Sequence, residues 1–535
     1  MFRKAIYILT VSNLLMGTAF AQKNLSEEVS VIRPYKPILA EAIKINTNPE
    51  IKFEEQGKNV PEYHFLSHRI DSMLTLNPAS IEKMKSESIS KLSRNYVRLA
   101  GGNYLSSYLE IWHTNLRSKE WSLGAHAKHR ASKGSVDNMD FSNQNIDLFA
   151  TRMYSKQTIR MKALYERDVR HFYGYDHSVF DFKPSDVRQK FDFFGFQSEI
   201  LSNNENKKEN IVYNANFDFY STKDAFNANE NRFSISGYGA YKEYQSKIGI
   251  DLAKHEDSLS QENNLFYIEP SIHLEQYGLN VDLGFNAYQE FGSVNRLHLY
   301  PKINLEYTLT EIDAQLSAGL DGRMRKQSFR DFYKQNPFLT DNIRIENTNE
   351  KLHLYARIRG RIDVKNAYSG SIQYYSLSNE AYFVSDTNVY NSYKVIYDGP
   401  KASVTDFNID FSHQSNNKLR LLAGFRYSIY KTDTLREAYH RPNTSIRLGA
   451  DYNIANKFLL EAQLYSYSGM KAPDRNGTIQ DLKGGVDLNL GIDYRYSKII
   501  SVYLNLNNVL NYKREQYLYY SGYGFQAMLG ASFRF

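Results

Sequence analysis

Residues 525–535 read FQAMLGASFRF, and this stretch decides the fold. Successive side chains of a strand point to opposite faces. One face here is apolar, made of Phe525, Ala527, Leu529, Ala531, Phe533 and Phe535, and the other carries Gln526, Met528, Gly530, Ser532 and Arg534. A strand with this alternation is stable between lipid and a wet interior. The pattern recurs through most of the chain and predicts an all-β protein, a transmembrane antiparallel β-barrel.

Three internal stretches show the same alternation: residues 352–363, 419–429 and 486–496. In the first of them, leucine, alanine and isoleucine side chains are predicted to face lipid, while histidine, tyrosine and arginine face the lumen. A charge on the lipid face near the bilayer midplane costs roughly 2 to 4 kcal/mol. The register of these strands therefore has little freedom.

The spacing of the alternating runs predicts about 22 strands, with 20 as the alternative because the first run, residues 96–100, is short. Short connections alternate with long ones. The short ones, expected on the periplasmic side, include residues 155–157, 245–246, 276–278 and 453–457. The long ones, expected outside the cell, are residues 169–187, 321–350, 380–400, 432–443 and 469–483.

Aromatic composition supports a barrel. The chain has 43 Tyr and 31 Phe in 535 residues, which is more Tyr than a soluble core needs. Tyr suits the two membrane interfaces, where its ring is buried and its hydroxyl stays wet. Mean hydropathy is negative, as expected when only alternate residues of each strand meet lipid.

The N-terminus predicts export. Arg3 and Lys4 precede an apolar run, and residues 19–21, Ala-Phe-Ala, form a small-residue cleavage site. Removing this signal peptide, residues 1–21, lowers the formal charge from +7 to +5. The chain has no cysteine, so it has no disulfide, no thiolate metal site and no lipidated N-terminal cysteine. We expect an integral protein of a Gram-negative outer membrane.

Residues 22–94 are expected to form a periplasmic or luminal segment, and residues 95–535 the barrel. The segment holds Pro34, Pro37, Pro61 and Pro78, is rich in charge and shows little alternation. Asn77 and Pro78 predict the start of one short helix over residues 79–90. A barrel of about 22 strands is wider than its own side chains can fill. The N-terminal segment is therefore the predicted plug.

The closing part of the chain resembles TonB-dependent receptors, especially those of Bacteroidetes. The resemblance rests on residues 493–498 (DYRYSK), 502–511 (VYLNLNNVLN) and 522–524 (GYG) before the last strand. Residues 31–37 (VIRPYKP) and 96–104 (YVRLAGGNY) resemble receptor-like proteins of the same bacteria. The resemblance implies a receptor-like barrel, but about 73 residues before the barrel are too few for a full plug domain.

A receptor of this kind also needs an extended N-terminal segment that pairs with an energising, TonB-like protein. Glu28, Val29, Ser30, Val31 and Ile32 form the candidate box. The alternative is that these residues form a tether or strand lining the lumen. The resemblance further implies that the barrel-assembly machinery reads the terminal aromatic residues Phe533 and Phe535.

The lumen wall offers the main candidate site. A basic wall concentrates anions, whereas buried charges need partners, so pairing with nearby acids is the alternative. The candidate lumen-lining residues are His353, Tyr355, Arg357, Arg359, Arg361, Arg420 and Arg426, and the candidate acidic partners are Glu306, Asp451, Asp487 and Asp493.

Other kinds of site are not favoured. Residues 171–177, HFYGYDH, combine two histidines with an acid and aromatic rings, but their spacing matches no metal geometry, and an aromatic surface loop is the alternative. No nucleophile elbow, phosphate loop or zinc signature is present, so we expect no enzyme, cofactor or metal. Acids nearly balance the dispersed basic residues, so nucleic acid is not an expected partner.

Two functions are consistent with the sequence. In the first, the barrel binds or passes a solute through a plugged, arginine-lined lumen, as a receptor or porin-like transporter. In the second, it is a non-transporting accessory subunit whose long loops, residues 321–350 above all, dock partners in a larger outer-membrane complex. Membrane lipid and the barrel-assembly machinery are expected partners in both.

Overall fold

The structure, a computed structural model, describes residues 93–535 apart from 116–117, 205, 207–208, 341, 387–391 and 416–417. The predicted signal peptide, the helix over residues 79–90 and the candidate box at residues 28–32 lie outside the described residues. So does the predicted plug-like segment, except for its last two residues.

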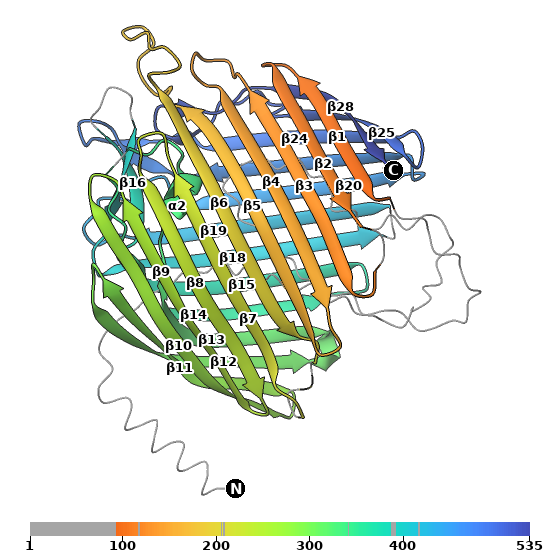
Figure 1. The fold of residues 1–535 in the computed structure, drawn as a ribbon, viewed down its shortest axis with the longest axis vertical. Coiled ribbons are helices and arrows are strands. Elements are labelled where there is room, and N and C mark those ends of the chain that lie inside the picture. The colour runs from red at the N-terminus through yellow and green to blue at the C-terminus, as the bar shows by residue number, and fades with distance from the viewer. Residues whose placement is uncertain are drawn as a thin grey trace, which may run out of the picture.

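Twenty-two strands form one closed antiparallel sheet, as the alternation predicts, with each strand paired to its neighbours along the chain (Figure 1). Pairing of β1 with β28 closes the barrel. The barrel strands are β1 (Asn95–Gly102), β2 (Ser106–Thr114), β3 (Trp121–Ser132), β4 (Phe141–Met153), β5 (Gln157–His171), β6 (Arg188–Ser202), β7 (Val212–Lys223), β8 (Asn229–Tyr241), β9 (Tyr244–Glu256), β10 (Ser260–Gln276), β11 (Leu279–Gly292), β12 (Arg296–Leu309), β13 (Ala314–Arg325), β14 (Thr348–Arg361), β15 (Asn366–Ser378), β18 (Ala402–Ser415), β19 (Leu419–Lys431), β20 (Thr444–Ile454), β21 (Phe458–Ser468), β24 (Gly485–Arg495), β25 (Ile500–Asn507) and β28 (Gln526–Arg534).

The two faces of the wall differ as the alternation predicts. Large apolar side chains are exposed on the outward face, for example Leu529 (62% exposed) in β28, whereas Ser532 on the inner face of the same strand is 4% exposed. Inner-face polar groups pair across strands instead: the His126 ring lies 2.9 Å from Asp147 and 3.1 Å from Glu110. No helix in the described part of the chain is long and apolar enough to cross a membrane.

The seam between the first and last strands is held by backbone bonds and by side chains that include Asn103 and Tyr503. The carbonyl of Phe535 accepts hydrogen bonds from the backbone N–H groups of Arg94 and Asn95, at 3.0 and 2.8 Å. The Tyr503 hydroxyl donates to the carbonyl of Leu99 at 3.1 Å, crossing above Gly530. The absent side chain of Gly530 provides the space for this ring.

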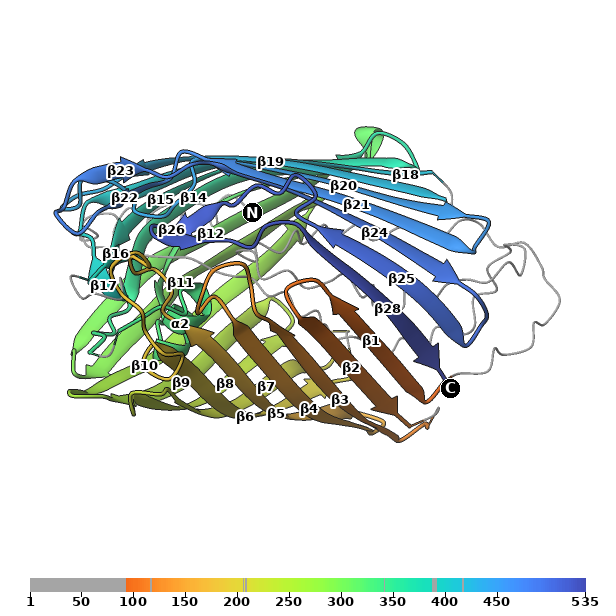
Figure 2. The same ribbon diagram turned by 90° about the horizontal axis from the view of Figure 1, so that it is seen from above.

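The longest connections all lie at one end of the barrel (Figure 2), but the predicted alternation in length is incomplete, because the same end also carries short connections at residues 103–105, 257–259 and 293–295. The turn predicted at residues 245–246 is instead made by Lys242 and Glu243, because β9 already begins at Tyr244. Lys242 adopts the left-handed conformation that this tight turn needs. One turn carries the 3₁₀ helix η1 (Thr310–Ile312).

The long connections carry the remaining elements. These are α2 (Phe329–Gln335), β16 (Ala381–Ser385), β17 (Tyr393–Tyr397), β22 (Lys471–Pro473), β23 (Ile479–Asp481), β26 (Glu515–Tyr517) and β27 (Tyr520–Ser521). The connection predicted over residues 321–350 is shorter in the structure, because β13 and β14 continue their pairing past a bulge, with Arg323 opposite Glu350.

Candidate functional site: the loop assembly over one end of the barrel

The long connections fold onto one another at their end of the barrel (Figure 2). We call the described residues of connections 172–187, 326–347, 379–401, 432–443, 469–484 and 508–525 the loop assembly. Four of these connections, 172–187, 326–347, 379–401 and 508–525, share an apolar core with a few residues of the neighbouring wall, such as Phe191, and the other two pack in separate apolar clusters. The most deeply buried members of the shared core include Phe329, Phe332, Leu339, Tyr393, Tyr517 and Tyr520. This core lies at the end of the barrel at which the long connections meet.

Helix α2 is fixed to the inner wall by its N-terminus. Ser328 caps the helix, accepting a hydrogen bond from the backbone N–H of Asp331 at 3.0 Å. The buried carboxylate of Glu230, on β8, accepts a hydrogen bond from the backbone N–H of Phe329 at 2.8 Å and another from the Tyr220 hydroxyl at 2.7 Å. A carboxylate at this position complements the positive end of the helix dipole.

Side chains of α2 also contact the wall at β5 and β6. Arg330 and Lys334 both contact the Glu166 carboxylate, at 2.9 and 2.7 Å. The Arg330 guanidinium lies 3.6 Å from the centroid of the Phe193 ring. Wall strands β5, β6 and β8, which are distant from α2 in sequence, therefore hold this short helix (Figures 1 and 2).

Two tyrosines join separate loops by their hydroxyl groups. Tyr393, fully buried in β17, donates to the carbonyl of Leu518 at 2.7 Å, and Tyr517, in β26, donates to the carbonyl of Gln335 at the end of α2, also at 2.7 Å. Their rings lie 5.4 Å apart, edge to face. Connections 326–347, 379–401 and 508–525 thus meet at these two side chains.

His440 brings a fourth connection to the same junction. Its Nδ1 donates to the carbonyl of Phe383 at 3.1 Å, and its Nε2 accepts from the backbone N–H of Leu518 at 3.5 Å. Because the carbonyl can only accept, these bonds assign the proton to Nδ1. Burial lowers the pKa of His440 to about 3, since the charged ring would lose its solvation.

A buried aspartate joins connections 379–401 and 432–443 a second time. The Asp398 carboxylate accepts hydrogen bonds from the backbone N–H groups of Asp433, Thr434 and Leu435, at 3.0, 2.8 and 3.1 Å. Three donors converging on one carboxylate form an anion nest that fixes the shape of the receiving loop.

The predicted lumen stripe lies on β14 below the loop assembly. His353 stacks on Tyr375 and lies 3.1 Å from Asp321, and Tyr355 donates to Asn304 at 2.5 Å. The guanidinium of the exposed Arg357 lies over the Tyr355 ring. Two further arginines pair with acids: Arg359 with Glu306 (3.5 Å) and Arg361 with Asp313 (2.7 Å).

The two candidate arginines on β19 also have acidic partners. Arg420 lies 2.6 Å from Asp451, and Arg426 lies 2.7 Å from Asp406. Asp487, considered as a partner of this group, pairs instead with Arg514 at 2.8 Å, and Asp493 interacts with Arg495 on its own strand. Most of the wall's positive charge is therefore matched by neighbouring carboxylates.

The aromatic loop at residues 171–177 belongs to the loop assembly. Phe172 and Tyr175 are buried, and the Tyr173 hydroxyl donates to the carbonyl of Ser521 at 2.9 Å. The His177 ring lies 4.1 Å from the Tyr175 ring, tilted by 35°, and the Nδ1 of His171 lies 3.2 Å from Asp140. Among the described residues, no three His, Asp or Glu side chains converge as a metal site requires.

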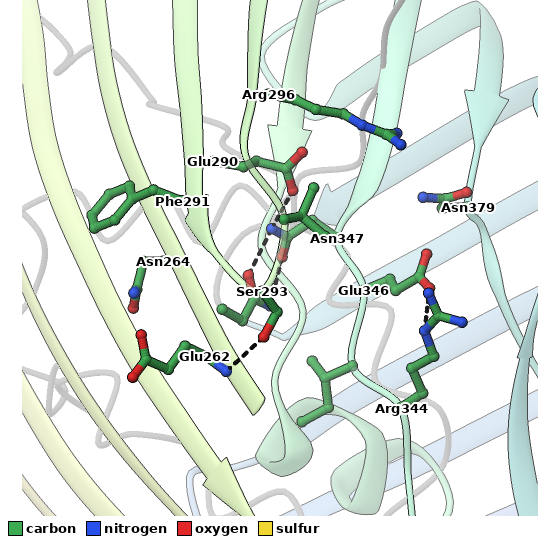
Figure 3. Close-up of a pocket in the computed structure, with 13 residues that line it drawn as sticks. Glu262, Asn264, Glu290, Phe291, Ser293, Arg296, Arg344, Glu346, Asn347 and Asn379 are labelled. Atoms are coloured by element: carbon green, nitrogen blue, oxygen red, sulfur yellow. Dashed lines mark hydrogen bonds and ion pairs between the residues drawn. The ribbon is translucent and has the colours of Figure 1, made fainter. Parts of the chain in front are cut away.

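A small polar pocket lies where the loop assembly meets the wall (Figure 3). It has a volume of about 100 Å³ and is lined by the start of β10, the β11–β12 turn and residues 344–347. Two pairs of its polar groups are in contact: Asn347 donates to Glu290 at 2.8 Å, and Arg344 lies 2.5 Å from Glu346. A space of this size holds a few water molecules. We therefore assign the pocket a structural role, as part of the contact between the loop assembly and the wall.

The sequence analysis did not identify His440, Tyr393 or Tyr517 as functional residues. The only signal for them was the density of aromatic residues in the long connections, because the residues that form the junction come from four separate loops.

No protein-family model matches the chain. A search of curated proteins also gives no match.

Solved structures do match. One is the FrpB iron transporter from Neisseria meningitidis, at 10% identity and a TM-score of 0.64, covering 84% of this chain and 82% of that one. Another is the pyoverdine receptor FpvA from Pseudomonas aeruginosa, at 11% identity and 0.61, covering 84% and 79%. A third is the ferric enterobactin receptor PfeA from P. aeruginosa, at 13% and 0.60, covering 82% and 80%. The chain has the 22-strand barrel fold of TonB-dependent outer-membrane receptors.

Proposed function

We propose that this protein is an outer-membrane barrel of the TonB-dependent-receptor type that binds or passes a solute through its lumen. We further propose that its loop assembly keeps the outer mouth closed until the loops part. The observation that carries the proposal is the apolar core shared by four of the long connections, with Tyr393 fully buried in it. The exposed apolar outward face and the fold of the structural neighbours support a membrane location.

The proposed solute path runs past the polar wall below the loop assembly. Arg357 is exposed there, and Arg359, Arg361, Arg420 and Arg426 line the same wall beside their carboxylates. A wall of this kind favours small anions or anionic complexes, which paired arginines bind by exchanging partners. Residues 22–94 would act as a second closure, and residues 28–32 as the contact for an energising partner.

Planar-bilayer conductance tests the two closures separately. The four proteins are the mature chain, the chain lacking residues 22–94, the chain with Tyr393→Ala and Tyr517→Ala, and the combination. Two closures in series predict conductance only in the combination, with a preference for anions in a salt gradient. Heat-modifiable migration on gels verifies that each barrel is folded.

Two outcomes would contradict the proposal. If the chain lacking residues 22–94 conducts as well as the combination, the loop assembly does not close the mouth. If the combination stays silent, the lumen is sealed by the wall itself, and the accessory-subunit function takes its place.

The proposal also predicts how the barrel is assembled. Phe535→Ala keeps the backbone bonds to Arg94 and Asn95 but removes the exposed terminal ring. We expect less folded protein in cell membranes, because the assembly machinery would lose its aromatic signal, but unchanged thermal stability of the folded fraction. Pulse-chase assembly in cells, compared with refolding of the purified variant in detergent, checks this. Equal assembly in cells would contradict it.

A further inference from the structure

A groove of about 540 Å³ opens on the outward face of the wall, beside the turn that joins β8 to β9. Its floor is a row of small residues on neighbouring strands: Gly239 lies opposite Ser246, which lies opposite Pro270. Taller apolar side chains border the row, namely Ile211, Tyr241, Tyr244, Ile272 and Phe285.

The groove follows from the residues at its floor. Along the same two strands, other outward positions hold exposed bulky residues such as Ile235 and Ile248, with Gly237 as an exception. A Cβ atom placed on Gly239 would meet no heavy atom within 4 Å. Pro270 has no N–H, and the pairing of β10 with β11 is interrupted beside it. The outward surface of the wall therefore has a depression here, because no side chain occupies the space above Gly239.

The chemistry around the groove fits one end of an amphipathic molecule. The lining is almost entirely apolar, and Tyr244 and Phe285 are 65% and 49% exposed on its borders. Tyr side chains mark the level at which a bilayer meets water. Lys242, in the adjoining turn, places its ammonium group 5.1 Å from the centroid of the Tyr241 ring. An apolar groove thus ends beside a cation at the expected head-group level.

We propose that this groove holds an acyl chain of a membrane phospholipid, with the phosphate of that lipid near Lys242. The inference rests on the proposed membrane location of the barrel. In a bilayer, an unfilled groove would deprive its walls of dispersion contacts, and a fitted chain restores them. The lipid belongs to the leaflet on the side of the short turns.

Photo-crosslinking tests the site in proteoliposomes of the full mature chain. The probe is a phosphatidylethanolamine that carries a diazirine on one acyl chain, and mass spectrometry maps the adducts. We expect adducts concentrated on the groove borders, such as Ile272 and Phe285. Gly239→Leu and Ser246→Leu should each lower this labelling several-fold, because both fill the floor.

Gly237→Leu is the matched control. Gly237 lies on the same strand, outside the groove lining, and a Cβ there would meet only the Asn214 carbonyl, at 3.8 Å. It should leave labelling at the groove unchanged. Labelling spread evenly around the outward face, or unchanged by both filling variants, would overturn the inference. Failure of the chain to float with liposomes would instead overturn the proposed membrane location.

Discussion

The barrel wall and the loop assembly bury opposite kinds of side chain. In the wall, Glu110 and His126 are buried on the inner face while Ile146 and Leu148 are about half exposed on the outside. In the loop assembly, Phe329, Phe332 and Tyr393 are buried in the centre. In the proposed membrane location, lipid surrounds the wall and water surrounds the loops, so each region buries the side chains that are unfavourable in its own surroundings. The two regions should therefore respond differently to the same kind of change.

The largest effect is expected at the seam of the wall. A Cβ atom on Gly530 would overlap the Leu99 carbonyl and the Tyr503 ring. Gly530→Val should therefore prevent closure between β1 and β28, and most of the protein should fail to form the heat-modifiable barrel. Gly239→Val, on an open part of the wall, is the control and should fold normally. Equal folding of both variants would show that the seam tolerates a side chain.

Substitutions in the core of the loop assembly should strongly destabilise the loops and leave the barrel intact. Tyr393→Ala should destabilise the closed loops by about 3 to 5 kcal/mol, the usual cost of removing a buried aromatic ring. Tyr393→Phe removes only the hydroxyl and should cost about 1 kcal/mol. Hydrogen exchange of the loops measures both costs. The thermal transition of the barrel should not move, and a parallel loss of barrel stability would mean that wall and loops unfold as one unit.

Acid should loosen the loop assembly through His440. Its folded pKa of about 3 lies below its unfolded value near 6.5, so the folded loops bind fewer protons. Stability is therefore complete above about pH 6.5 and falls by about 1.4 kcal/mol for each pH unit below it, until the pH reaches the folded pKa near 3. Arg441, beside the ring, stays positive throughout and opposes its protonation.

Loop hydrogen exchange between pH 7 and pH 5, corrected for intrinsic rates, measures this dependence. His440→Gln should flatten it, even if the variant is less stable at pH 7. A slope that persists in His440→Gln would assign the pH dependence to another group.

The smallest effect is expected from an ion pair at the end of the wall. Arg361 and Asp313 lie 2.7 Å apart, but the aspartate side chain is 62% exposed. Exposed pairs contribute about 0 to 1 kcal/mol. Arg361→Gln should therefore leave the barrel's unfolding transition almost unchanged, with Asp313→Asn as the matched variant. A clear lowering of the barrel's unfolding transition in either variant would show that this ion pair stabilises the wall.

The wall could be predicted from the sequence because its pattern is local. A period of two, repeated over each strand, determines which side chains face lipid, and the number of repeats gives the number of strands. Residues 525–535 by themselves show this alternation of apolar and polar side chains. The misplaced turn at residues 245–246 is a shift of a few residues, since Tyr244 and Ser246 continue the alternation of β9.

The loop assembly could not be predicted in the same way. The abundance of Tyr was assigned to the membrane interfaces, whereas Tyr333, Tyr393, Tyr517 and Tyr520 form part of a buried core. Nothing in the sequence near His440 indicates that Phe383 and Leu518 provide its hydrogen-bond partners. These contacts join segments far apart in the chain, and only the closed barrel brings them together.

Solvent access to the lumen wall tests most directly whether the loop assembly closes the barrel. The natural chain has no cysteine, so Arg357→Cys introduces a unique thiol on the inner wall. A membrane-impermeant thiol reagent is added to intact cells, on the loop side. Labelling should be slow in the otherwise natural chain and many-fold faster when Tyr393→Ala and Tyr517→Ala are also present. Equal rates in the two proteins would contradict closure by the loops.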